Sequence, residues 1–133
     1  MDAERDGWVG GLNFGQFRTD VAELVLAALA KTAAHLLLNY ETRGDIVGRN
    51  AHLAVKMAAP LWDALSALPR CEPEMEQVRT TAAIRCLAGV VGHFGDLATQ
   101  GPENHNAIID QSVKAAVQSA QALVKILSGD ACP

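Results

Sequence analysis

The sequence predicts an all-α protein, an antiparallel up-down-up-down four-helix bundle, on the basis of three observations. Four long segments repeat apolar residues at helical spacing, with a narrow polar stripe opposite. Half of the 133 residues are apolar but only 5% are aromatic, so the core consists mainly of small side chains that let helices approach closely. Glycine and proline separate the segments, and the connections are short enough to favour antiparallel neighbours.

The first predicted helix covers residues 17–40 and is broken by residues 42–44, which include a glycine. The second covers residues 45–68, with Asp45 as its N-cap and Pro60 in its interior. An interior proline removes a backbone hydrogen bond, so Pro60 either kinks this helix or separates two shorter ones.

The third predicted helix covers residues 73–99, and the fourth runs from Asn104 or Asn106 to Ser128, where Gly129 is a stop signal. These elements form a bundle over residues 15–129. The charged, glycine-rich residues 1–14 are expected to form a mobile N-terminal arm, and residues 130–133 a disordered tail.

Charge and composition exclude several classes of partner. The net charge is −4 and no Lys/Arg cluster occurs, so nucleic acid is not an expected partner. No uncharged apolar run reaches about 18 residues, and the N-terminus lacks the pattern of a signal peptide, so no membrane span is expected. Three cysteines without a CxxC motif favour free thiols in a reducing compartment. The sequence therefore predicts a cytoplasmic protein.

Three glycines, Gly89, Gly92 and Gly95, recur every third residue in the third segment. Each costs about 1 kcal/mol relative to alanine inside a helix. Another helix backbone could approach this face closely, within the chain or across a dimer. The helix could instead open there to admit a ligand, or the glycines could simply be tolerated. We expect this face to support helix packing, with a homodimer as the favoured arrangement.

Catalytic and metal-binding signatures are missing from the sequence. No nucleophile motif, catalytic carboxylate pair or P-loop is found, so no enzyme is predicted. The histidines lack the inward-facing Glu-x-x-His pattern of metal sites in bundles, so neither a metal nor a cofactor is expected. Arg85 lies beside core positions. It either extends to the surface along its aliphatic stem, or is buried with a carboxylate partner, or binds a ligand.

Three stretches resemble the focal-adhesion-targeting type of four-helix bundle found at the C-terminus of GIT scaffold proteins. They are residues 51–58 (AHLAVKMA), 74–87 (EMEQVRTTAAIRCL) and 109–126 (IDQSVKAAVQSAQALVKI), about half of the chain. The resemblance implies binding of short leucine-rich helical peptides in grooves between helix pairs. Basic residues flank these grooves in the family, and the matching positions are Lys31, Lys114 and Lys125 on one side and Lys56 and Arg79 on the other. The glycine triad departs from the family's pattern.

These observations favour a non-enzymatic protein-protein interaction module, or small adaptor, that binds partner helices in grooves of the bundle. The alternative is a small-molecule-binding regulator or sensor with a pocket inside the bundle near Arg85. An open apolar groove favours the first function, and an enclosed polar cavity favours the second.

Overall fold

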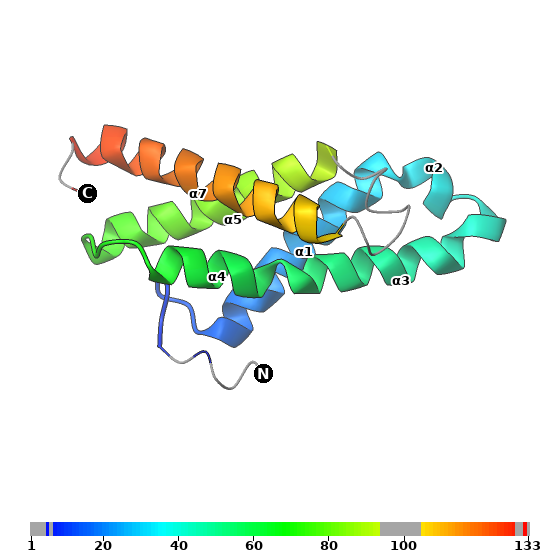
Figure 1. Ribbon diagram of the computed structural model, residues 1–133, viewed down its shortest axis with the longest axis horizontal. Coiled ribbons are helices and arrows are strands. Elements are labelled where there is room, and N and C mark those ends of the chain that lie inside the picture. Colours follow the sequence, from blue (N-terminus) through cyan, green and yellow to red (C-terminus); the bar gives the residue numbers. More distant parts are fainter. Residues whose placement is uncertain (1–4, 6, 94–104, 130–131, 133) are drawn as a thin grey trace.

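The computed structural model describes residues 5, 7–93, 105–129 and 132, and every regular element in these residues is a helix (Figure 1). The all-α class is therefore confirmed for this part of the chain. None of the described helices is long and apolar enough to cross a membrane. The helices are α1 (Phe14–Thr32), α2 (Ala34–Leu37), α3 (Tyr40–Lys56), α4 (Ala58–Ser66), α5 (Pro73–His93) and α7 (His105–Ser128).

The first predicted helix is too long, because α1 ends at Thr32, the short α2 follows it and a new helix begins at Tyr40. Asn39 explains the restart, since its extended backbone and its side chain, which accepts from the Glu41 N–H at 2.9 Å, cap α3. The Thr42 hydroxyl donates to the Leu36 carbonyl at 2.6 Å and so ties the new helix to the end of α2. The predicted break at residues 42–44 therefore lies inside α3.

The second predicted helix is two shorter helices, α3 and α4, rather than one helix with a kink. Their junction lies at Met57, between the end of α3 and the start of α4. Pro60 is the third residue of α4, in the first turn, where a backbone N–H has no intrahelical partner. The proline is therefore accommodated without the loss of a helical hydrogen bond.

The helices pack in an order that differs from their order in the chain. α5 makes its most extensive contacts with α7 and α1, and α4 packs against α7 and α1. In Figure 1, α1 and α5 both run towards the right, whereas α3, α4 and α7 run towards the left. The neighbours α1 and α5, and α4 and α7, are therefore parallel, and neither pair is consecutive in the chain.

An aromatic cluster anchors the core where α1 meets α4. The Trp62 ring lies edge-to-face with Phe14 at 5.3 Å and with Phe17 at 5.1 Å between ring centroids. All three side chains are buried. Along α1 the core continues at spacings of three to four residues through Val21, Val25 and Leu29.

A tight turn precedes α1 and packs against α5. Val9 and Leu12 exchange two backbone hydrogen bonds, at 2.9 and 3.0 Å, around Gly10 and Gly11. Both glycines have positive φ, 58° and 81°, as a two-residue turn of type I′ requires. Gly10 lies so close to the Thr80 side chain that a Cβ atom would clash. This packing places the turn against α5, whereas the mobility of residues 1–14 and of the tail stays a prediction.

Candidate functional site

An open groove of about 620 Å³ lies between α5 and α7. The two helices run side by side over much of their length (Figure 1). On α5 the groove is shallow and partly apolar, because Val78 and Ala82 are small and half-buried. The residues that line it are Glu74, Gln77, Val78, Thr81, Ala82, Arg85 and Leu123.

One wall of the groove continues into an exposed apolar surface, which we call the α7 apolar face and which consists of Leu123, Ile126 and Leu127. Their side chains are 40%, 79% and 57% exposed. At 100° per residue they lie within about 100° of helical arc. Leu123 and Leu127 continue the core stripe of α7 in the sequence, yet the described residues cover them only in part. Scattered apolar residues are normal on a surface, but a cluster on one helix end indicates an interaction site.

Arg85 is exposed on α5 and lines this groove, so the expectation that it extends to the surface is confirmed and the buried alternative is wrong. It also borders a smaller surface hollow of about 270 Å³, next to Asp20 and Glu23 of α1. Both hollows open to solvent on the outside of the helices. The structure therefore describes no enclosed cavity at Arg85 among the residues that it covers.

The five basic residues proposed to flank peptide grooves do not form one surface. Lys31 lies in the last turn of α1 and Lys125 in the last turn of α7, and these helix ends lie on opposite sides of Figure 1. Lys31, Lys56, Lys114 and Lys125 are exposed, and Lys114 pairs with Asp110 at 3.3 Å. Of these lysines, Lys125 is the one adjacent in sequence to the α7 apolar face.

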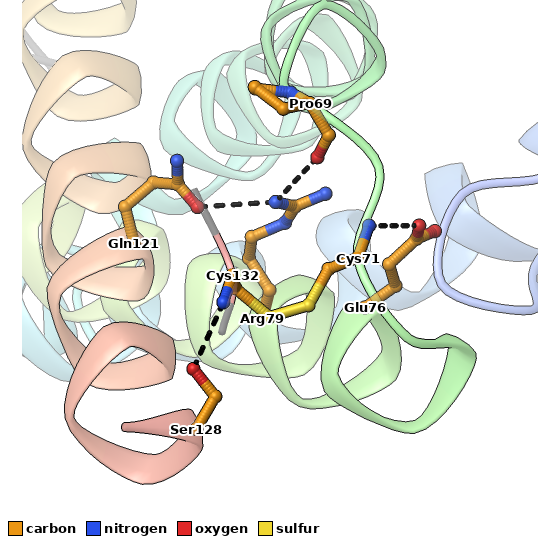
Figure 2. The surroundings of a disulfide bond; sticks show 7 residues. All are labelled: Pro69, Cys71, Glu76, Arg79, Gln121, Ser128 and Cys132. Atoms are coloured by element: carbon orange, nitrogen blue, oxygen red, sulfur yellow. Dashed lines mark hydrogen bonds between the residues drawn. A yellow bond between two sulfur atoms is a disulfide. The ribbon is translucent and has the colours of Figure 1, made fainter. Parts of the chain in front are cut away.

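Arg79 is the exception in that set, because it is buried, with 5% of its surface exposed. Its Nη1 donates to the Pro69 carbonyl and to Gln121 Oε1, both at 3.2 Å (Figure 2). Burial lowers the pKa of the Arg79 guanidinium, an effect that Glu76 opposes and Arg70 adds to. An arginine stays protonated in proteins, so Arg79 is a buried cation and not a surface residue that flanks a groove.

A disulfide next to Arg79 joins Cys71 to Cys132, with 5.3 Å between their Cα atoms (Figure 2). The prediction of free thiols is wrong for this pair and holds for Cys86. The bond ties the connection between α4 and α5 to the segment after α7. Glu76 supports the connection by accepting from the Cys71 N–H at 2.9 Å. The sequence did not indicate this pairing, because the chain has an odd number of cysteines and these two are 61 residues apart.

The glycines of α5 differ in their surroundings. Gly92 packs against α1, where an added Cβ would lie 3.3 Å from Ala28 Cβ, and its carbonyl accepts from the Thr32 hydroxyl. Around Gly89 an added Cβ would meet nothing within 4 Å. Gly95 lies outside the described residues. Close approach within the chain therefore explains Gly92 and leaves Gly89 on the surface.

Among the described residues no group of three or more His, Cys, Asp or Glu side chains lies close enough to hold a metal ion. His35, His52 and His93 are exposed, whereas His105 is buried at the start of α7.

Comparison of the chain with protein families, with curated proteins and with solved structures gave no match. The resemblance to focal-adhesion-targeting-type bundles is therefore neither supported nor contradicted, and the functional argument depends on the geometry of the described surfaces.

Proposed function

We propose that the protein is a non-enzymatic interaction module that binds one amphipathic helix of a partner protein along the α5–α7 groove. The observation that carries this proposal is the α7 apolar face, where Leu123, Ile126 and Leu127 are exposed at the edge of that groove. Large apolar side chains lose contact with water only if another surface covers them, and each fully buried one contributes about 1.5–3 kcal/mol.

A helix fits the groove better than an extended peptide does. The described residues form helices and no sheet edge, so an extended peptide has no strand to pair with through backbone hydrogen bonds. A partner helix can place apolar residues at spacings of three, four and seven between Leu123 on one side and Val78 and Ala82 on the other. Arg85 in the groove and Lys125 beside the face favour a partner with acidic residues at the rim.

The larger architecture supports this mode of binding. We propose that α1 with α2, α3 with α4, α5 and α7 act as the four rods of an up-down-up-down bundle. Grooves between such rods are shallow where small side chains line them.

A homodimer remains a proposal. Of the two described glycines in α5, Gly89 is the one that is open to a second copy. The cytoplasmic location was predicted from free thiols. The Cys71–Cys132 disulfide removes that argument, because disulfides persist in oxidising compartments.

Site-specific photo-crosslinking tests the proposed surface. A photoreactive residue at Ile126 should give one discrete cross-linked product in the cells that make the protein. A matched probe at Val47, which is 51% exposed on α3, should not. Equal cross-linking from both positions would show that the α7 face has no special role.

A synthetic peptide of the cross-linked segment then measures the affinity. Its binding to Ile126→Lys should weaken at least tenfold, which corresponds to about 1.4 kcal/mol, and its binding to Val47→Lys should not change. A cross-linked segment that belongs to the protein itself would instead identify a homodimer, which light scattering would confirm.

A further inference from the structure

A separate hollow of about 180 Å³ lies away from the α5–α7 groove, between the N-terminal turn, the end of α4 and the first half of α5. Trp62, Leu65 and Leu68 form an apolar wall, and Trp8 and Gly10 contribute from the turn. Arg79 and Thr80 also line the hollow, and both are buried. A buried cation therefore borders a hollow about as large as a small organic molecule, with one apolar wall and one polar wall that also includes Arg70 and Glu76.

The Arg79 guanidinium has donors left over. Nη1 makes both of its hydrogen bonds, to the Pro69 carbonyl and to Gln121, and the other guanidinium nitrogens donate to no described residue. No described carboxylate lies within ion-pair distance of it. Glu76 is engaged elsewhere, by the Cys71 N–H at 2.9 Å and by Arg70 at 3.6 Å. Glu76 acts on Arg79 as a nearby negative charge but makes no hydrogen bond to its guanidinium. A ligand carboxylate can satisfy the remaining guanidinium donors through two parallel hydrogen bonds.

We propose that this hollow binds a small monocarboxylate whose apolar body lies against Trp62, Leu65 and Leu68 and whose carboxylate pairs with Arg79. The volume suits a single ring, because a cavity of about 150 Å³ accommodates benzene. Arg70 and Glu76 also line the hollow and pair with each other at 3.6 Å, so the lining has one positive charge in excess, that of Arg79. One carboxylate balances this charge. A ligand with two negative charges is therefore disfavoured, and this distinguishes a carboxylate from a phosphate monoester.

The turn that closes the hollow is fixed by close packing. Gly10 leaves no room for a Cβ against Thr80, so this wall depends on a glycine at that position. Trp8 is 62% exposed at the rim, and Trp62 is buried in the wall. Because these are the two tryptophans of the chain, intrinsic fluorescence reports on the hollow directly.

The test is a titration of the full chain with phenylacetate, followed by tryptophan fluorescence and by calorimetry, with neutral phenylacetamide and the dianion phenyl phosphate as controls. Phenylacetate should bind at least tenfold more tightly than either control. No binding of phenylacetate, or equal binding of phenylacetate and phenylacetamide, would overturn the proposal.

Two variants separate ligand binding from a structural role of Arg79. Arg79→Gln should abolish the preference for the anion, but it also removes hydrogen bonds to the α4–α5 connection and can unfold the protein. Ser66→Phe does not touch Arg79 and fills the hollow from an exposed position at the end of α4. It should weaken phenylacetate binding at least tenfold, whereas Ser119→Phe, at an exposed serine of α7, should not. Unchanged binding in Ser66→Phe would place the ligand elsewhere and refute the assignment.

Discussion

The aromatic cluster at the start of α1 and the apolar face at the end of α7 are both rich in large apolar side chains, but their environments are opposite. Trp62 is buried between Phe14 and Phe17, with ring centroids 5.3 and 5.1 Å away. Ile126 at the other site is 79% exposed. The helical pattern is similar at both, so the difference lies in whether a neighbouring element covers the stripe. The covered cluster stabilises the fold, and the uncovered face is available for binding.

Truncation of the covered cluster should have the largest effect on stability. Trp62→Ala removes a buried ring and both edge-to-face contacts, so it should lower the free energy of unfolding by about 3–5 kcal/mol. Ile126→Ala should change it by about 0.5 kcal/mol or less, because the side chain is mostly in water. Chemical denaturation followed by circular dichroism measures both, and similar losses would contradict the contrast between the two regions.

Loss of the disulfide should have the next largest effect. Cys132→Ser opens a loop between residues 61 positions apart, so the free energy of unfolding should fall by about 2–4 kcal/mol. A reducing agent should produce the same loss in the wild type and no further loss in Cys132→Ser. Cys86→Ser is the matched control, since Cys86 is a free thiol. A wild type that is insensitive to reduction would show that the bond does not support the fold.

The two described glycines of α5 sharpen the comparison between covered and uncovered surface. Gly92→Leu should cost about 1–3 kcal/mol by overpacking against Ala28, whereas Gly89→Leu should be accommodated in open space. Light scattering on both variants tests the dimer prediction in parallel. A wild-type dimer that Gly89→Leu splits into folded monomers would place the interface on Gly89, and a wild-type monomer would end that proposal.

The smallest expected effect is a gain in stability. Gly89→Ala should raise the free energy of unfolding by up to about 1 kcal/mol, because alanine is the better helix former and nothing obstructs its Cβ. Gly92→Ala should gain less, since its Cβ would lie 3.3 Å from Ala28 Cβ. Thermal unfolding ranks the two variants, and a larger gain at Gly92 would contradict the packing described.

The sequence predicted the helical class because the apolar spacing is set locally, by residues three and four apart. Helix boundaries were predicted less well. The capping side chain of Asn39 begins α3 at Tyr40, before the expected break, and the helix continues through Gly44. The order of packing depends on contacts between distant segments, which local patterns do not contain.

The candidate sites were less predictable than the fold. Arg85 was expected to extend to the surface and is exposed, whereas Leu123 and Leu127 have the spacing of core residues and are exposed as well. Exposure of these leucines depends on contacts between distant segments, which no local pattern contains. Arg79 lies four and eight residues before the buried Ala83 and Leu87, so its spacing is that of the core stripe of α5. Its hydrogen-bond partners, the Pro69 carbonyl and Gln121, come from distant segments and could not be predicted locally.

The measurement that tests the central claim most directly is photo-crosslinking from a photoreactive residue at Arg85, in the groove. It compares the wild-type protein with a variant in which the α7 apolar face is made polar. We predict that the wild-type background gives a discrete cross-linked partner. Replacement of Leu123, Ile126 and Leu127 by glutamine should abolish the product while the circular dichroism spectrum stays unchanged. An undiminished cross-link in the folded triple variant would contradict the claim that the uncovered face of α7 is the binding surface.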